Sequence, residues 1–439
     1  PSMLRRGVLL RRLLPRSSRV LPVRFYNLVD FKSLRENLVE QQANVDSRGG
    51  GVNISEVVEL YESKNSVAKE LDEKLRRRKE LAKLTRTDET IQEARSLKGT
   101  IAECQSQLNE MSRNLDALAA KIPNSTSTQT PSSQEGFRVL EYCGTEPSFD
   151  FAPLHHLDIC NAHNLVDFES ASTVSGQKFC YLTGAAALLE LALTHWAMHF
   201  YASRGFEPIC TPDLVRPDVV QGCGFNPRGE HAQIYHVKDH DLCLTGTAEV
   251  PLAGLVSRRK LTIQDLPRRY VGVGHSFRTE AGATGQADKG LYRLHQFTKV
   301  ELFVVCHPDD SEREFESLLK LQKEAFGQLG LHFRVCEMPA DDLGAPAHRK
   351  VDMEAFLAGR GGFGEISSTS NCTDYQSRRL NIRVPQPGQA AMLPHTLNGT
   401  ACAVPRMILA ILETHQQRDG SVDLPPVLRP LMHGAASIG

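Results

Sequence analysis

One apolar stripe, in residues 97–118, limits the possible folds of this chain more than any other part of its sequence. Apolar side chains recur there at spacings of 4, 3, 4, 3, 4 and 3 residues: Leu97, Ile101, Cys104, Leu108, Met111, Leu115 and Leu118. Such a repeat is typical of a coiled-coil seam. A looser stripe precedes it, after an N-cap signal formed by Asn53 and Glu56. Thr87 or Asp88 can cap the second helix, so the sequence predicts two helices of roughly 30 residues in an antiparallel coiled-coil hairpin about 45–50 Å long.

Cations gather close to the predicted tip of this hairpin. The stretch KLRRRKELAKLTR contains seven of them, opposed only by Glu80: Lys74, Arg76, Arg77, Arg78, Lys79, Lys83 and Arg86. A charged run on a helix is often no more than a solvated face, but cations on a rigid lever also suit a phosphate backbone. The formal net charge of the chain is only −1, so a nucleic-acid partner is predicted from this local cluster alone.

The first 26 residues differ in composition from the rest of the chain. They hold seven arginines and no acidic residue, and the first acid is Asp30. Such a segment is typical of a mitochondrial presequence, so residues 1–26 predict import into the mitochondrial matrix; a basic tail that binds RNA or a membrane is the alternative. Eleven scattered cysteines without a C-x-x-C pair indicate a reducing compartment. No run of 18 apolar residues occurs, so no membrane partner is expected.

Composition also divides the chain into domains. Residues 27–123 form the predicted helical arm, and the polar stretch NSTSTQTPSSQEG marks a linker at 124–137. From residue 138 to residue 439, strand-like and helix-like segments alternate without internal repeats. This second part is predicted to be one large α+β domain.

The stretch FRTEAGATGQADKGLYRLHQFTKVELF, residues 277–303, carries the candidate chemistry. Two strand-like runs flank a glycine-containing loop. Because residues two apart share a face of a strand, we expect Arg278 and Glu280 to point the same way. On the return strand the same rule groups His295, Phe297, Lys299 and Glu301.

A charged face exposed to solvent is the simplest alternative for this hairpin, but it does not account for Phe297 among the charges. A nucleotide site does account for it. Arg278 can bridge anionic oxygens, Phe297 can stack on a base, and Glu301 can bind an ammonium or hydroxyl group.

Five segments, in order, resemble those of the seryl-tRNA synthetases, a family of class II aminoacyl-tRNA synthetases. The hairpin resembles motif 2, GFEPICTPDLV (205–215, with Pro212) resembles motif 1, and LNGTACAVPRMILAILE (397–413, with Arg406) resembles motif 3. TGTAEVPL is similar to the family's serine-binding loop, and GEISSTSNCTDYQSRR is similar to its metal and ATP segment. The resemblance spans residues 30 to about 430. The presequence and NCTDYQSRRL favour the animal mitochondrial branch.

The resemblance implies a class II antiparallel sheet flanked by helices, a homodimer, and serine–tRNA ligase activity in mitochondrial translation. L-serine and ATP would form seryl-adenylate, and serine would then be transferred to tRNA(Ser) held by Arg76, Arg77, Arg78 and Lys79. The implied ATP site contains Arg278, Thr279, Glu280, Leu294, His295, Phe297, Glu365, Ile366, Ser367, Ser368 and Arg406. Glu365 and Ser368 would bind Mg²⁺, for which oxygen ligands are suited.

Each implied role agrees with the chemistry of its side chain. Arg278, as a catalytic residue, would align the serine carboxylate with the α-phosphate and stabilise the charge that develops there. Phe297 and Arg406, the second catalytic residue, would sandwich the adenine ring. Glu280 would accept a hydrogen bond from the adenine amino group, and Leu294 and His295 would line the nucleotide pocket.

The resemblance also implies how serine is selected, through Thr247, Ala248, Glu249, Arg278, Glu301 and Thr400. A buried pocket built for a hydroxyl group rejects alanine by roughly 10⁴ or more, because its polar groups would be left unpaired. Threonine is excluded by lack of room. No editing domain is therefore expected.

Three alternatives remain open. A catalytically inactive, RNA-binding relative would be expected to lose the charged site residues, yet these are present. An enzyme for threonine or alanine is disfavoured by the Thr-Ala-Glu loop and the arm, and a zinc-dependent seryl enzyme by the lack of clustered Cys and His ligands. Outside the five segments, Asp352 and Glu354 are predicted to be solvent-facing strand residues. His155, His156 and His275 are predicted to be structural.

Overall fold

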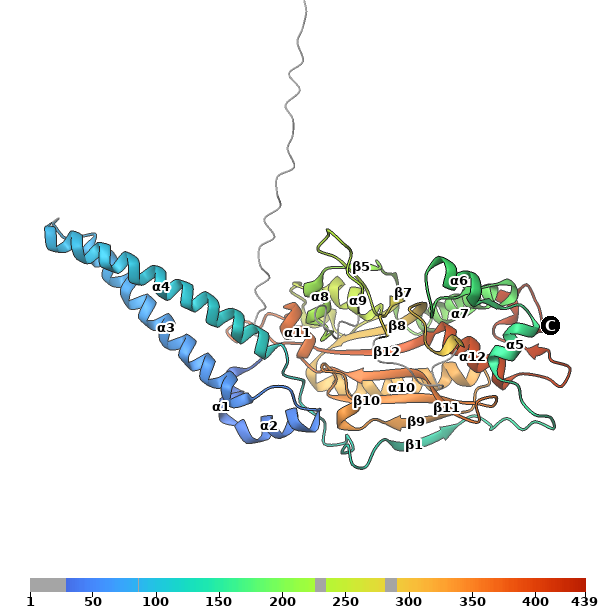
Figure 1. Ribbon diagram of the computed structural model, residues 1–439. Coiled ribbons are helices and arrows are strands. Elements are labelled where there is room, and N and C mark those ends of the chain that lie inside the picture. Colours follow the sequence, from blue (N-terminus) through green and yellow to red (C-terminus); the bar gives the residue numbers. More distant parts are fainter. Residues whose placement is uncertain (1–28, 86, 226–233, 281–289) are drawn as a thin grey trace, which may run out of the picture.

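A long helical arm projects from an α+β body in the computed structural model, which describes residues 29–85, 87–225, 234–280 and 290–439 (Figure 1). The predicted presequence, Arg86 and most of the glycine-containing loop at 281–289 lie outside the described residues. None of the helices in the described ranges combines the length and the hydropathy that a bilayer crossing requires.

The arm consists of the two predicted long helices, α3 (Ile54–Leu81) and α4 (Asp88–Ala119), above the shorter α1 (Phe31–Glu36) and α2 (Leu38–Ser47). All seven residues of the predicted seam are buried or half-buried, which confirms the coiled-coil prediction. The Asn53 side chain accepts from the backbone N–H of Ser55 at 2.9 Å, so it caps α3 as predicted. Thr87, not Asp88, caps α4, through a reciprocal pair with Thr90.

The base of the arm is tied to the body by polar contacts. Asn124 Nδ2 donates to the carbonyl of Cys372 at 2.8 Å, and Arg48 Nη2 donates to that of Gly344 at 2.6 Å. The backbone N–H of Ser127 donates to the carbonyl of His348 at 2.9 Å. The first residues of the polar segment at 124–137 are therefore attached to the body, because hydrogen bonds satisfy their polar groups there.

Eight strands form one sheet in the described part of the chain, in the order β1-β9-β10-β11-β12-β8-β7-β4. Neighbouring strands are antiparallel except for β4 and β7, which are parallel at one edge. The bounds are β1 Arg138–Cys143, β4 Glu207–Cys210, β7 Arg268–Phe277, β8 Gln296–Cys306, β9 Phe333–Glu337, β10 Arg349–Leu357, β11 Gly362–Asn371 and β12 His395–Ala403. This sheet, its flanking helices and the arm confirm the predicted fold class.

Helices pack against both faces of the sheet. The large core lies between the sheet and α7 (Gly184–Ala202), α10 (Ser311–Gln328) and α12 (Val404–Thr414), with Leu193, Phe326 and Ile408 fully buried. On the opposite face α9 (Glu249–Val256) packs with Phe303 and Val305 of β8. Alternation along β8 then puts Phe297, Lys299 and Glu301 on this second face, beyond α9.

Shorter elements complete the body. The helices are α5 His156–Ala162, α6 Phe168–Val174, α8 Pro217–Gly222 and α11 Tyr375–Leu380. The two-stranded pairs are β2 Val166–Asp167 with β3 Tyr181–Leu182, β5 Leu214–Val215 with β6 Cys243–Leu244, and β13 Val422–Asp423 with β14 Ser437–Ile438.

The prediction that Arg278, Glu280 and His295 lie on the strands of the 277–303 hairpin is wrong. Strand β7 ends at Phe277 and β8 begins at Gln296, so Arg278, Glu280 and His295 lie outside the strands. Glu280 has a φ of 48°, which no strand residue adopts. Strand alternation therefore does not explain the direction of these three side chains, although it holds for Phe297, Lys299 and Glu301.

Candidate active site

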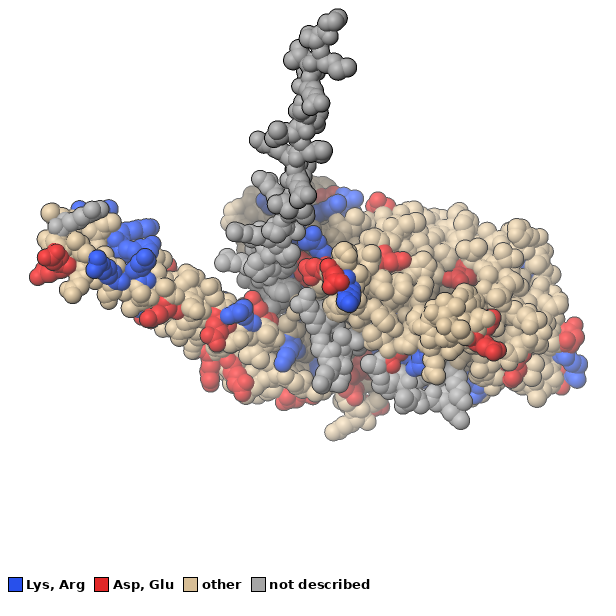
Figure 2. Space-filling view, turned by 45° about the horizontal axis from the view of Figure 1, so that its top comes forward, with Lys and Arg blue, Asp and Glu red and all other residues tan. Residues whose placement is uncertain are grey.

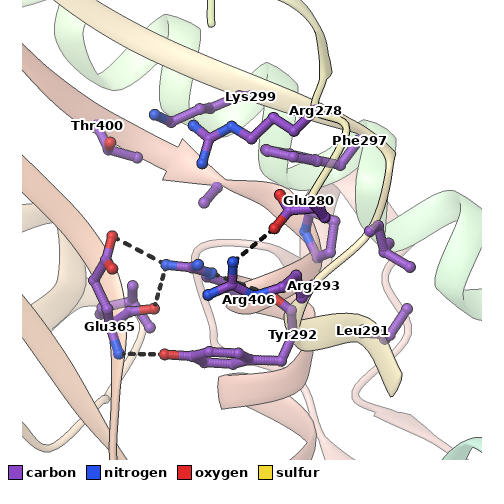
Figure 3. Close-up of a pocket in the computed structure, with 14 residues that line it drawn as sticks. Arg278, Glu280, Leu291, Tyr292, Arg293, Phe297, Lys299, Glu365, Thr400 and Arg406 are labelled. Carbon is purple, nitrogen blue, oxygen red and sulfur yellow. Dashed lines mark hydrogen bonds and ion pairs between the residues drawn. The ribbon is translucent and has the colours of Figure 1, made fainter. Parts of the chain in front are cut away.

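A pocket of about 480 Å³ lies over the part of the sheet that α9 leaves uncovered (Figure 3). Eight of its lining residues belong to the predicted site: Arg278, Glu280, Leu294, Phe297, Glu365, Ile366, Thr400 and Arg406. Six do not: Leu291, Tyr292, Arg293, Lys299, Ala403 and Pro405.

Two guanidinium groups enter this pocket in different electrostatic settings. Arg278 Nε donates to the carbonyl of Gly246 at 3.2 Å, and its guanidinium carbon lies 5.3 Å from the centre of the Phe297 ring. Arg278 forms no ion pair with a carboxylate among the described residues. Burial lowers its pKa, and the positive charge of Arg406 lowers the pKa further. A poorly compensated cation in a pocket attracts an anionic ligand.

Arg406 is held by four contacts on the other side of the pocket, one of which is the hydrogen bond that its Nη1 donates to the carbonyl of Glu365 at 3.1 Å. Its Nη1 lies 3.0 Å from Glu365 Oε1, its Nε donates to the carbonyl of Tyr292 at 3.3 Å, and its guanidinium lies over the Tyr292 ring at 4.6 Å. Figure 3 shows Phe297 and Arg406 on opposite sides of the pocket. A flat ring and a flat cation that face each other can enclose a planar aromatic ligand.

Tyr292 and Arg293 hold two acidic residues of the predicted site, Glu365 and Glu280, although neither was itself a predicted site residue. The Tyr292 hydroxyl accepts from the backbone N–H of Glu365 at 2.9 Å, and Arg293 Nη1 donates to Glu280 Oε2 at 2.6 Å. Both residues belong to the quoted hairpin, in the helical turn Gly290–Tyr292 and just after it. The sequence puts both residues in this hairpin. It does not reveal that Tyr292 contacts Glu365, because Glu365 is far away in the chain.

A β-bulge brings the predicted metal ligands to one face of the sheet. Residues three apart on a regular strand point to opposite faces. The register between β10 and β11 shifts so that Asp352 lies opposite Ser368 while Glu354 lies opposite Glu365. The extra residue lets Glu365 and Ser368 share the pocket-side face. Ser367 points the other way, because its hydroxyl donates to the carbonyl of Thr400 and it also contacts Gln322 of α10.

The prediction that Asp352 and Glu354 face solvent is wrong. Asp352 is 3% exposed, and Glu354 Oε2 accepts from Arg334 Nε at 2.6 Å. Burial raises the pKa of Asp352 to about 7, and the neighbouring charge of Glu365 contributes to this rise. For Glu365 burial also acts to raise the pKa, but the positive charges of Arg406 and Lys350 outweigh it and lower the pKa. Hydrogen bonding of β10 to β9 and β11, which no local pattern reveals, buries Asp352 and leaves Glu354 half-buried.

The donor chemistry of this face fits Mg²⁺. The Glu365 carboxylate and the Ser368 hydroxyl are hard oxygen donors, and one carboxylate oxygen of Asp352 beside them is buried without a hydrogen-bond partner among the described residues. A different group of possible metal ligands, formed by His155, His156 and Glu413, does not line the pocket. There Glu413 accepts from His156 Nδ1 and from three backbone N–H groups, so its carboxylate is already saturated. This confirms a structural role for His156.

The predicted serine residues gather around two carboxylates next to the pocket. Thr247 Oγ1 donates to Glu301 Oε1 at 2.6 Å, and Lys299 forms an ion pair with the same carboxylate. Thr400 stands opposite Glu301 in the register between β12 and β8. Ala248 is fully buried at the start of α9. The structure thus brings Thr247, Glu301 and Thr400 together with Arg278 and Lys299.

Glu249 lies behind them in a network that sequence reasoning did not identify. Its Oε1 accepts from Gln376 Nε2 at 2.6 Å and from Asn398 Nδ2 at 3.0 Å. Burial raises the pKa of Glu249 to about 7, and the charge of Glu301 raises it too, although the Gln376 hydrogen bond opposes the shift. Gln376 lies on α11 and Asn398 on β12, so only the tertiary fold brings them to this carboxylate.

Of the predicted ATP-site residues, Thr279, His295, Ser367 and Ser368 do not line the pocket. His295 lies beside it, with Nδ1 at 2.7 Å from the carbonyl of Arg278 and at 3.0 Å from the Tyr235 hydroxyl. Thr279 follows Arg278 and is also absent from the lining of this pocket. His295 therefore positions the Arg278 backbone, since one hydrogen bond links them directly.

Arg76, Arg77, Arg78 and Lys79 lie on exposed turns of α3 near the free end of the arm, where Figure 2 shows a cluster of Lys and Arg side chains. Arg77 Nε donates to Glu93 Oε1 of α4 at 2.8 Å, so part of its charge is compensated. The four cations are far from the pocket, at the end of a stiff pair of helices. They can act on a partner only by direct contact with it.

Comparison with known proteins agrees with this geometry. Residues 28–126 match the model of the seryl-tRNA synthetase N-terminal domain, and residues 234–415 match the class II core domain of synthetases for G, H, P, S and T. A serine–tRNA ligase of Treponema denticola is 39% identical over 92% of this chain and 98% of its own length. That of Rubrobacter xylanophilus is 42% identical over 92% and 97%.

Solved structures give the same result. Seryl-tRNA synthetase from Pyrococcus horikoshii, solved with ATP, is 33% identical with a TM-score of 0.85 over 93% of this chain and 99% of its own. The cytoplasmic serine–tRNA ligase of Naegleria fowleri, solved with AMP, is 26% identical with a TM-score of 0.82 over 93% and 98%. Both the arm and the catalytic body are thus shared with these relatives, and the chain belongs to the seryl-tRNA synthetase family of serine–tRNA ligases.

Proposed function

We propose that this serine–tRNA ligase binds ATP and L-serine in the pocket of Figure 3, forms seryl-adenylate there and transfers serine to tRNA(Ser). One observation carries the proposal: the Arg278 guanidinium enters the pocket without a carboxylate partner among the described residues. Two anions, the serine carboxylate and the α-phosphate, supply that partner. The structures with ATP and AMP in two relatives are consistent with a nucleotide at this place.

In the first step a serine carboxylate oxygen attacks the α-phosphorus, a P–O bond forms, and pyrophosphate leaves with the electrons of the bond that breaks. Arg278 holds both reactants, which converts their encounter into a step within one complex. It also stabilises the negative charge that grows on the phosphoryl oxygens. Phe297 and Arg406 hold the adenine ring between them, and Glu280 accepts a hydrogen bond from its amino group.

In the second step a hydroxyl oxygen of the terminal ribose attacks the seryl carbonyl carbon, and AMP leaves with its phosphate oxygen. No side chain forms a covalent intermediate in either step. Glu365 and Ser368 would hold Mg²⁺, which supplies charge neutralisation for the phosphates when it is bound. The side chains of this protein bind and orient the reactants, and they exclude water.

Serine selection rests on Glu249, Glu301, Thr247 and Thr400. Carboxylates bind the serine ammonium group, and a buried set of donors and acceptors favours the hydroxyl group. Alanine would leave these groups unpaired.

A homodimer is supported by the apolar surface of α7. Leu188 and Leu191 of this helix are 41% and 68% exposed, and β4 beside it lies at the edge of the sheet. Burial of such a face against a second copy removes apolar area from water. This expectation follows from the motif 1 resemblance of residues 205–215.

The tRNA partner is supported by the arm, whose Arg76, Arg78 and Lys79 form no ion pair among the described residues. Residues 1–26, rich in arginine and free of acids, support import into the mitochondrial matrix and the animal mitochondrial branch of the family. The relatives reported above are bacterial, archaeal and protist proteins, so this assignment rests on the N-terminal residues and on the segment NCTDYQSRRL.

Serine-dependent exchange between ATP and pyrophosphate tests the proposed reaction with the full chain. Exchange with serine, and with neither alanine nor threonine, is the expected result; no exchange at all would instead favour an inactive, RNA-binding protein. Aminoacylation of mitochondrial and cytosolic tRNA(Ser), compared side by side, tests the cellular setting. Preference for the cytosolic tRNA would contradict it.

A further inference from the structure

We propose that Asp352 is a third protein ligand of the metal ion that Glu365 and Ser368 hold, an inference that rests on the proposed function. Asp352 is outside the five segments that resemble the family's motifs. The structure nevertheless puts it on the same face as the two predicted ligands, directly opposite Ser368.

The bulge in β11 is what assembles the three groups. Asp352 of β10 faces Ser368, and the next pocket-side pair along the two strands is Glu354 with Glu365. Glu354 is already neutralised by Arg334 and Glu365 is already paired with Arg406. Of the carboxylates on this face, Asp352 is therefore the one whose charge is least compensated by arginine.

The Asp352 carboxylate is also incompletely satisfied. The residue is 3% exposed, and its Oδ1 is buried without a hydrogen-bond partner among the described residues. Its Oδ2 lies 3.4 Å from Lys350 Nζ, and Lys350 also contacts Asp342 at 3.3 Å. Leaving a charged oxygen buried and unpaired is costly, and such an atom in a native site usually indicates a missing partner. A divalent cation is a partner of the right charge and chemistry.

The competing explanation is that Asp352 is a neutral acid with a purely structural role. Asparagine has the same shape as a protonated aspartate and keeps one amide oxygen, so Asp352→Asn preserves a neutral structural group while it removes the anionic oxygen. Asp342→Asn is the matched control, because it makes the same change at an exposed carboxylate that contacts the same lysine. Asp352→Glu keeps the charge at this position.

The experiment measures Mn²⁺ binding to the full-length protein with a non-hydrolysable ATP analogue, from the electron paramagnetic resonance signal of free Mn²⁺. We expect Asp352→Asn to weaken Mn²⁺ binding by about 10–100-fold, the usual effect of losing a group that supports a metal site. Asp342→Asn should match the wild type, and Asp352→Glu should bind Mn²⁺ more tightly than Asp352→Asn. Thermal unfolding checks that each variant is folded.

Two results would overturn the inference in distinguishable ways. If Glu365→Gln weakens Mn²⁺ binding while Asp352→Asn stays within about twofold of the wild type, the metal site is real and Asp352 is structural. If the wild type shows no ATP-dependent Mn²⁺ binding, or Glu365→Gln has no effect, the metal site of the proposed function is itself wrong. A loss equally large in Asp342→Asn would show that Lys350, and not Asp352, is responsible.

Discussion

Replacing Arg278 by methionine should strongly reduce serine activation and at the same time stabilise the fold. Burial and Arg406 lower the pKa of Arg278, which means that the charged form is less favourable in the folded chain than in the unfolded chain. Removing the charge therefore favours folding, and methionine keeps most of the apolar stem. For a half-buried cation we expect a gain of about 1–2 kcal/mol, at the lower end of the range for buried ionic groups. The unfolding midpoint should rise by about 2–4 °C.

The same substitution should lower the rate of exchange between ATP and pyrophosphate. Each charge-assisted hydrogen bond contributes about 1.5–3 kcal/mol, and Arg278 is proposed to make one to each of two anions. Their joint loss, about 3–6 kcal/mol, corresponds to a decrease of about 10²–10⁴-fold in kcat/KM. Steady-state exchange kinetics at saturating and limiting serine provide the measurement.

Arg269→Met is a matched control with the opposite sign in stability. Arg269 donates through Nε and Nη2 to the carboxylate of Glu314, at 2.8 and 2.6 Å, and Glu314 is 2% exposed. Its loss leaves a buried carboxylate unpaired, at a cost of about 3–5 kcal/mol, but exchange by the folded protein should be unchanged. If Arg278→Met also lowers the unfolding midpoint, or keeps exchange within tenfold of the wild type, Arg278 has a structural role and the proposed mechanism is wrong.

The arm should contribute to tRNA affinity and not to activation. Changing Arg76, Arg77 and Arg78 to alanine should weaken tRNA binding and remove two to three phosphate contacts, so the slope of log K against log salt concentration should decrease by roughly 2–3. The rate of ATP–pyrophosphate exchange should be unchanged. Arg77→Ala alone should have the smallest effect, since Glu93 already compensates its charge; equal loss of exchange and tRNA binding would refute the division of roles. The pKa of Glu249, raised to about 7, predicts that the carboxylate becomes protonated as the pH falls through 7, so the KM for serine should be about tenfold higher at pH 6 than at pH 8. Glu249→Gln should raise KM and remove this pH dependence; a pH dependence that persists in the variant would assign it to another group. Phe297→Ala should raise the KM for ATP by the loss of about 1–3 kcal/mol of stacking, while the KM for serine, measured in the same exchange assay, should change much less.

Local patterns in the sequence were sufficient to predict the arm and the side chains that β8 directs toward the site. The seam from Leu97 to Leu118 and the cap at Asn53 are properties of neighbouring residues on one helix, so their signal survives in the sequence. The same is true of Phe297, Lys299 and Glu301, which share a face because a strand alternates. The resemblance to the family supplied Glu365 and Arg406, which lie far from this hairpin in the chain.

Other parts of the site depend on contacts between distant segments. Gln376 and Asn398 reach Glu249 only because α11 and β12 pack beside α9, and Tyr292 reaches Glu365 only across the pocket. The direction of Arg278 and Glu280 depends on where β7 ends, which alternation did not reveal.

The sequence by itself determined the helical arm, its cations and the alternating face of β8, because each is set by the period of a single helix or strand. The tertiary structure alone decided that Asp352 is buried beside Glu365 and Ser368, since this requires a strand register and a bulge formed between residues of different strands. Hydrogen bonding between β10 and β11 fixes that register, and one residue of slip would turn the carboxylate of Asp352 to the opposite face of the sheet.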